Sequence, residues 1–394
     1  MQISLEDVQN ETDSYQFFLD SLKAKDTLRK YKSSLGHFLN AIPTSVFLET
    51  EKAKSSDVST LAKLFVNLAR KDPELAKKII TAYVKQMRKL VEEDKMSANT
   101  LPNYVKPIKA FLEINGVAIH WKSVYKLYPR ASPEADDRAY TREEIQRMLE
   151  VCNDVTDKVI VLMSSSGGFR VESWNFFKWK DVVFFKNSDG SFKGAALLVY
   201  RGDPEHYWTF ITPESCKMLE LYKELWKSQT GKYPMPDDPL LKITKQRKII
   251  RLEAPGVKRR LDKIVRKIGL RTSLPNGKRR YEVQLSHGFR KYFNTMMRRA
   301  GVNFLDKEDM MGHSVGLERH YERYSEEDFE RFSEYQKAIP YLTISNEERL
   351  RLKNNQLEDE KSTLERINDE KTKLIEEYQK LEARTRRLEK IHSK

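Results

Sequence analysis

The sequence has 394 residues, of which 33% are charged and 39% hydrophobic, and its formal net charge is +14 at pH 7. This length allows two or three domains with separate cores. No apolar run approaches the roughly 18–20 residues that cross a bilayer, and two cysteines, Cys152 and Cys216, exclude a disulfide framework or a cysteine-rich metal site. The acidic N-terminus lacks a signal peptide, so we expect a cytoplasmic protein.

The first part of the chain, residues 1–128, has the apolar periodicity of helices. The pattern is clearest over residues 28–39, 61–68, 79–84 and 104–112. A polar segment with two prolines and no periodicity, residues 129–139, follows and predicts a linker. We therefore expect a small helical domain that is joined flexibly to the rest of the chain.

The next part, residues 140–335, mixes helical and strand patterns. Thr141 and Glu144 match a capping box, which begins a helix. An apolar helix around residues 159–163 then leads to Arg170. Strand signals separated by turn residues predict a small antiparallel sheet at residues 182–185, 196–200 and 207–211. The expected fold class is therefore mainly α with a small antiparallel sheet (α+β).

Positive charge is concentrated in residues 242–299, which hold nineteen lysines and arginines but only three acidic residues. Like charges at this density repel one another unless a polyanion neutralises them, so we expect nucleic acid as the partner. A solvated charged face is the alternative, but such faces normally mix both signs. The candidate DNA-binding residues are Lys245, Arg247, Lys248, Lys258, Arg259, Arg260, Arg266 and Lys267.

A helix beginning near Ser286 and ending at Gly301 is predicted to carry His287 and Arg290. The two residues are three apart, so they share one face of that helix. A proton carrier and a permanent cation directed at one point suit a phosphate group. The alternative is an ordinary pair of surface residues.

A second short helix is predicted to end at Gly312 and to present His313, and Tyr321 and Tyr324 follow. Taken singly, a helix cap with an exposed imidazole and a tyrosine in a core are the ordinary interpretations. The order of an arginine, an HxxR motif, a Gly-His pair and a tyrosine is more specific. This order resembles the tyrosine recombinase (phage integrase) family, and the phrases MMGHSVGL and ITPES resemble its archaeal branches.

The resemblance covers roughly residues 137–333 and implies a mechanism. Tyr321, with Tyr324 as the alternative, would attack a DNA phosphate and form a 3′-phosphotyrosine bond, which conserves the energy needed for rejoining. Arg170 and Arg290 would bind the phosphate oxygens. His287 would take the tyrosine proton or hold the phosphate, and His313 would donate a hydrogen bond to it. No metal, cofactor or ATP is expected.

The sequence departs from the family pattern at two places. The family has a catalytic lysine in the turn between the second and third strands, but the corresponding turn, residues 201–206, contains none. Arg201 and Lys193 are the candidate equivalents, and an arginine is a poor proton donor. The acidic residue common three positions after the first arginine is replaced by Ser173, with Glu172 one position before it.

The C-terminal residues 345–394 contain no glycine or proline and show a heptad repeat. Eight of thirteen core positions are apolar, and polar residues interrupt the others, so the pattern predicts a coiled coil of moderate strength. A solitary charged helix and a docking arm for a host accessory protein are the alternatives. The apolar core positions are Leu350, Leu357, Leu364, Ile367, Leu374, Tyr378, Leu381 and Leu388.

The function that the resemblance implies is site-specific recombination of double-stranded DNA. Residues 1–128 would be a core-binding domain that closes over the DNA, residues 140–335 the catalytic domain, and the assembly a tetramer on paired sites. Such a protein would lie with the nucleoid when it is bound to DNA. Two other functions stay open: a monomeric type IB topoisomerase-like enzyme that relaxes DNA, and a DNA-binding structural protein that has lost catalysis.

Overall fold

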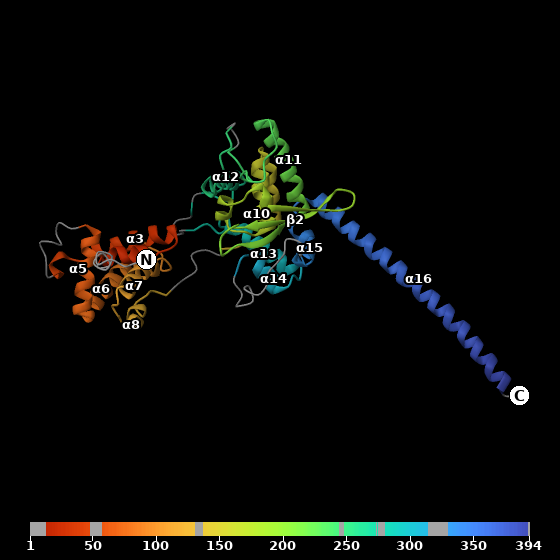
Figure 1. The fold of residues 1–394 in the computed structure, drawn as a ribbon, viewed down its shortest axis with the longest axis horizontal. Coiled ribbons are helices and arrows are strands. Elements are labelled where there is room, and N and C mark those ends of the chain that lie inside the picture. Colours follow the sequence, from red (N-terminus) through yellow and green to blue (C-terminus); the bar gives the residue numbers. More distant parts are fainter. Residues whose placement is uncertain are drawn as a thin grey trace, which may run out of the picture. The chain divides into compact units, whose positions relative to one another are not determined.

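The structure is a computed structural model that describes residues 13–47, 57–130, 137–243, 248–272, 274, 280–313 and 330–392 (Figure 1). The chain divides into two compact units, Met1–Glu134 and Ala135–Lys394. Within the described parts, most elements are helices and three strands form one sheet, so the predicted fold class is confirmed. The finer division into a linker, a catalytic domain and a tail stays a prediction.

The N-terminal unit is a bundle of helices around an aromatic core. Phe18, Phe38, Phe65 and Phe111 are all fully buried there. The four predicted helices are present, and two shorter ones were not predicted because seven and five residues are too few to show periodicity. The elements are α2 (Ser14–Asp20), α3 (Lys25–Asn40), η1 (Thr44–Val46), α5 (Val58–Lys71), α6 (Pro73–Glu92), α7 (Leu101–Ile114) and α8 (Trp121–Tyr125).

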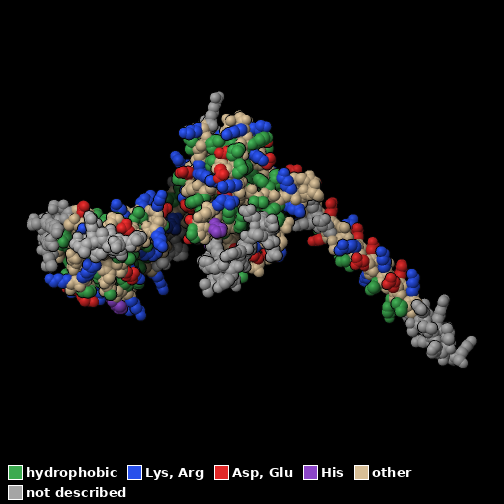
Figure 2. All heavy atoms as spheres, viewed as in Figure 1, with side chains coloured by type: hydrophobic (Ala, Val, Ile, Leu, Met, Phe, Trp, Pro, Cys, Tyr) green, Lys and Arg blue, Asp and Glu red, His purple; other side chains and the backbone are tan. Residues whose placement is uncertain are grey.

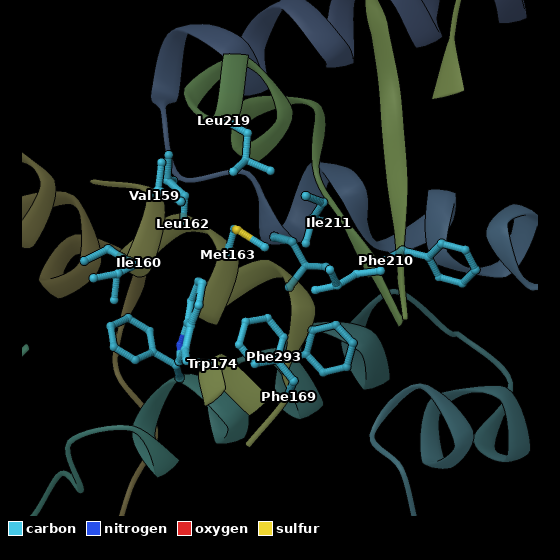
Figure 3. Close-up of a cluster of buried hydrophobic side chains, with 14 of the residues drawn as sticks. Val159, Ile160, Leu162, Met163, Phe169, Trp174, Phe210, Ile211, Leu219 and Phe293 are labelled. Carbon is cyan, nitrogen blue, oxygen red and sulfur yellow. The ribbon is translucent and has the colours of Figure 1, made fainter. Parts of the chain in front are cut away.

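The second unit is built around helix α10 (Val155–Gly167), which is buried on nearly all sides. Its apolar side chains pack against the sheet and against other helices of the unit. Figure 3 shows Val159 and Met163 of this helix in one buried cluster with Phe293. A helix that is apolar all round can be stable only inside such a core. The other helices are α9 (Arg142–Val151), η2 (Val171–Asn175), η3 (Trp179–Asp181), α11 (Pro213–Thr230), α12 (Ala254–Lys267), α13 (His287–Arg299), α14 (Phe304–Met310), α15 (Glu330–Leu342) and α16 (Asn346–His392).

The sheet has the order β1-β2-β3, and both pairs are antiparallel. Its strands are β1 (Val182–Lys186), β2 (Phe192–Val199) and β3 (Tyr207–Ile211). Strand β2 begins earlier than predicted, because Phe185 pairs with Gly194 whereas Lys186 pairs with Phe192. Lys193, between Phe192 and Gly194, is skipped in this register and is therefore the extra residue of a β-bulge.

Helix starts follow the capping chemistry of the sequence. Thr141 and Glu144 form the predicted capping box at α9, and Thr212 caps α11 with proline at the first helical position. Gly168 ends α10 in the left-handed region, with φ of +60°, and a Cβ there would lie 2.3 Å from the Phe293 side chain. Glycine is needed at this position for tight packing.

Helix α16 contacts the rest of the second unit at its start. The backbone N–H groups of Ile344 and Ser345 donate to Glu214 at 2.8 and 3.1 Å, and Leu352 packs on the core. Further along, apolar residues of the heptad are exposed, for example Leu374 at 69%. Acidic and basic side chains alternate along this helix in Figure 2. No helix in the described ranges is long and apolar enough to span a membrane.

Candidate active site

Helix α13 places His287 and Arg290 at the surface of the core. Its apolar residues Phe289, Phe293 and Met297 are buried, and this fixes the rotation of the helix. Ser286 is the N-cap residue as predicted, but its hydroxyl makes no capping hydrogen bond. The first turn of α13 therefore projects from a firmly packed base into an open pocket.

Arg290 is buried, with 6% of its surface exposed, and every acceptor of its guanidinium group in the described structure is neutral. Nη1 donates to the carbonyl of Gly168 at 2.7 Å, while Nη2 donates to the carbonyl of Met311 at 2.6 Å and to His313 Nε2 at 2.7 Å. Burial lowers the pKa of Arg290, and the positive charge of Arg170 lowers it further. The side chain is held in one position without a carboxylate to cancel its charge.

His313 is fixed by two partners. An arginine can only donate, so Nε2 of His313 must accept, and the imidazole proton lies on Nδ1. Nδ1 in turn donates to Glu308 Oε2 at 2.5 Å. Gly312 has φ of +65°, and a Cβ there would lie 2.3 Å from the Tyr207 ring. The predicted hydrogen bond from His313 to a phosphate stays a prediction, and it requires both that Arg290 release Nε2 and that Nε2 carry a proton.

Arg170 follows the end of α10 and lies beside α13. Its side chain lines a pocket of about 190 Å³ together with His287 and Arg290. Among the described residues, the Arg170 guanidinium forms no hydrogen bond or ion pair. The pocket thus brings together three of the predicted catalytic residues, from segments more than a hundred residues apart.

His287 is poised to be neutral near pH 7. Partial burial lowers its pKa below the ordinary value of 6.5, and the charges of Arg290 and Lys291 lower it further. A neutral imidazole can accept a proton, whereas a protonated one cannot. Tyr207, which is also buried beside Arg290, has its pKa raised to about 12 by burial and therefore stays protonated.

Two further residues line this pocket that the sequence did not place there. Lys258 from α12 and Glu172 from η2 form an ion pair with 2.9 Å between Nζ and Oε1. Lys258 was predicted only as a DNA contact, and it lies 29 residues before His287. Ser173, at the position where the family has an acidic residue, is buried.

The two candidate equivalents of the family lysine, Arg201 and Lys193, do not line the pocket. Arg201 Nε donates to Asp181, whose side chain is buried, so the guanidinium is already paired. Lys193 is exposed in the bulge of β2. The structure therefore brings neither residue to Arg170 and Arg290.

Helix α12 presents a basic outer face. Its apolar side chains point into the core, and Lys258, Arg259, Arg266 and Lys267 are exposed. Arg266 Nε is also paired, with Asp262 at 2.7 Å. Arg260 differs in being only partly exposed, and its Nη1 forms ion pairs with two carboxylates, Asp154 at 3.1 Å and Asp157 at 2.8 Å. Lys248 is exposed, while Lys242 is buried and donates to Gln229 at 2.5 Å. Part of the basic stretch is thus used inside the fold.

Four predicted site residues lie outside the described residues: Tyr321, Tyr324, Lys245 and Arg247. Within the ranges that the structure describes, no group of three or more His, Cys, Asp or Glu side chains is arranged to hold a metal ion.

No family model and no curated protein matches the sequence. Solved structures of recombinases and integrases are similar to it. The lambda integrase (75–356) dimer bound to a COC′ core site has 15% identity and a TM-score of 0.48, over 82% of this chain and 99% of that chain. XerH site-specific recombinase bound to difH substrate has 13% identity and a TM-score of 0.45, over 81% of this chain and 93% of that chain. XerA recombinase has 16% identity and a TM-score of 0.35, over 82% of this chain and 97% of that chain.

These are proteins of the kind that the sequence resembles. The function proposed for this chain rests on its own residues. The resemblance to archaeal branches in particular stays a prediction.

Proposed function

We propose that this chain is a site-specific DNA recombinase that cuts and rejoins strands through a 3′-phosphotyrosine intermediate. The observation that carries the proposal is the pocket between α13 and the segment after α10. There Arg290 is held only by neutral acceptors in the described structure, next to Arg170 and His287. A buried cation with no carboxylate beside it strongly favours an anion.

The phosphate of a DNA strand fits this pocket chemically. Its two non-bridging oxygens gain charge as a nucleophile attacks, and two guanidinium groups fixed in advance stabilise that charge at little reorganisation cost. Arg290 is fixed by its three hydrogen bonds, while the donors of Arg170 have no partner among the described residues. Arg290 would therefore make a rigid contact with the phosphate, and Arg170 could adjust its position to it.

The nucleophile is proposed to be Tyr321. It follows His313 by eight residues, and that length of chain reaches at most about 26–29 Å. On the other side, α15 begins nine residues later and is anchored by Phe332 and by Tyr335, whose hydroxyl donates to the carbonyl of Ser166 at 2.9 Å. Both ends of the intervening segment are therefore fixed on the unit that holds the pocket. Tyr324 lies eleven residues after His313 and six before α15, on the same segment, and stays the alternative.

The tyrosine proton must leave as its oxygen attacks. His287 lines the pocket, and its lowered pKa keeps it neutral near pH 7, so it can accept that proton. DNA would lie along the exposed cations of α12, and the helical N-terminal unit would close over it. The heptad face of α16 would promote assembly of DNA-bound protomers into a tetramer, weakly because polar residues interrupt it.

Trapping on a nicked suicide substrate tests the proposal. Cleavage of such a DNA releases a short fragment, which cannot be rejoined, and leaves the protein attached through a 3′-phosphotyrosine. We expect the attached species to form in EDTA and without nucleotide. Activity that disappears with EDTA and returns with magnesium would contradict the proposal and indicate a nuclease.

Two outcomes of the same assay correspond to the other functions. DNA binding without any covalent species would identify a DNA-binding structural protein, which the lack of a lysine in residues 201–206 makes worth testing. Covalent attachment together with relaxation of supercoiled DNA at any sequence, by a protein that stays monomeric, would identify a type IB topoisomerase-like enzyme.

A further inference from the structure

Cleavage requires a proton for the departing 5′ oxygen, and the arginines of the pocket are poor donors of one. Among the described residues that line the pocket of about 190 Å³, one is a lysine, Lys258 from α12. Lys258 shares this lining with Arg170, His287 and Arg290. A transferable proton is therefore present where the scissile phosphate would bind.

The ammonium group of Lys258 is held near the pocket by an exposed ion pair that it can leave. Nζ donates to Glu172 Oε1 at 2.9 Å, and the side chains of the two residues are 45% and 54% exposed. An ion pair this exposed stabilises the fold little. Lys258 can therefore move from the carboxylate to a phosphate oxygen when DNA binds, at small cost.

The other groups of the pocket do not offer this proton. Burial alone would raise the pKa of Glu172, but the hydrogen bond and charge of Lys258 lower it, so the carboxyl group is ionised near pH 7. His287 is neutral and serves to accept the tyrosine proton. Arg201 is already paired with Asp181, and Lys193 lies in the bulge of β2.

We propose that Lys258 is the general acid of DNA cleavage in this protein, a proposal that rests on the recombinase function proposed above. The Tyr321 oxygen forms a bond to phosphorus while the bond from phosphorus to the 5′ oxygen breaks. The tyrosine proton goes to His287, and a proton from Lys258 Nζ goes to the 5′ oxygen, which leaves as a hydroxyl. In rejoining, the neutral amine takes the proton back.

A substrate with sulfur in place of the bridging 5′ oxygen tests this role, because a thiolate leaves without being protonated. Lys258→Ala should cleave the ordinary substrate about 10²–10⁴-fold more slowly than the wild-type protein, and should cleave the sulfur-bridged substrate at nearly the wild-type rate. Lys258→Arg keeps the positive charge but donates its proton poorly, so it should stay slow on the ordinary substrate and recover on the sulfur-bridged one.

Lys263→Ala is the matched control, because Lys263 is an exposed lysine of the same helix that does not line this pocket. Its ratio of rates on the two substrates should equal that of the wild-type protein. If Lys258→Ala is slowed equally on both substrates, or on neither, Lys258 is not the general acid. If the wild-type protein attaches to neither substrate, the recombinase function itself is wrong, and the inference about Lys258 falls with it.

Discussion

Arg260 and Arg290 are both largely shielded from solvent in the second unit, yet the fold uses them in opposite ways. Arg260 faces two carboxylates, Asp154 and Asp157, at 3.1 and 2.8 Å. Arg290 faces two carbonyl oxygens and the Nε2 atom of His313. Burial by itself would lower the pKa of each guanidinium group, but the aspartates raise the pKa of Arg260 above its ordinary value, whereas that of Arg290 is lowered.

The difference in partners indicates a structural role for Arg260 and a binding role for Arg290. The charge of Arg260 is cancelled within the protein, so this residue joins α12 to the start of α10. The charge of Arg290 is positioned but not cancelled, which costs stability unless an anion binds. A cation kept in this state is typical of a functional site rather than of a structural one.

The largest effect is expected when the proposed nucleophile, Tyr321, loses its hydroxyl group. Tyr321→Phe should abolish covalent attachment to the suicide substrate while leaving DNA binding nearly unchanged, because only the nucleophilic oxygen is lost. Gel analysis of the trapped complex measures the first quantity and filter binding the second. Tyr324→Phe is the matched control and should still attach to the substrate. If Tyr324→Phe loses attachment completely while Tyr321→Phe stays active, Tyr324 is the nucleophile.

The pH dependence of cleavage tests the pocket next to Arg290. His287 must be neutral to accept a proton, and its pKa is below 6.5, so the rate at limiting DNA concentration should hold at pH 7 and fall as the pH drops through that lowered value. His287→Gln should be about 10²–10⁴-fold slower and should lack this acidic limb. A variant profile with the same limb would assign the titration to another group.

Salt dependence compares cations on one helix. Arg259 is exposed on α12 whereas Arg260 is paired with aspartates. If Arg259 contacts a phosphate, Arg259→Ala should reduce the slope of log affinity against log salt by about 0.9, and Arg260→Ala should leave the slope unchanged. Equal changes in the two variants would show that the ion pairs of Arg260 do not withhold it from DNA.

The smallest effect on cleavage is expected from the tail. Truncation after Lys353 keeps the contacts of Ile344 and Ser345 with Glu214 and the packing of Leu352. Cleavage of a single site should be unchanged, while strand exchange between two sites should be impaired. Sedimentation with paired sites measures assembly, and normal assembly by the truncated protein would favour a solvated helix or a docking arm for a host protein.

The candidate site residues that the sequence indicated lie in short motifs. The HxxR and Gly-His pairs gave His287, Arg290 and His313, because spacing of three or four residues on a helix is a local property. Strand β3 and the capping box at Thr141 were also predicted, because their signals lie within a few consecutive residues. Strand β2 was shortened in the prediction because the bulge at Lys193 interrupts the alternation.

The partners of the basic residues could not be predicted. Lys258 is 86 residues from Glu172, and Arg260 is more than a hundred residues from both of its aspartates. Whether a lysine or arginine is free, paired or in the pocket depends on these long-range contacts. Net charge therefore predicted a polyanionic partner but did not separate the cations that would bind it from those that hold the fold together.

The most direct test of this account is to compare Arg290→Gln with Arg260→Gln on the suicide substrate, after chemical denaturation has established how much of each variant is folded. Per folded molecule, Arg290→Gln should attach about 10²–10³-fold more slowly than the wild-type protein, because a fixed donor to the developing charge is lost. Arg260→Gln should lose about 1–3 kcal/mol of stability and attach at close to the wild-type rate. Attachment by Arg290→Gln at the wild-type rate, or an equal loss in both variants, would contradict the claim that Arg290 is held for the phosphate.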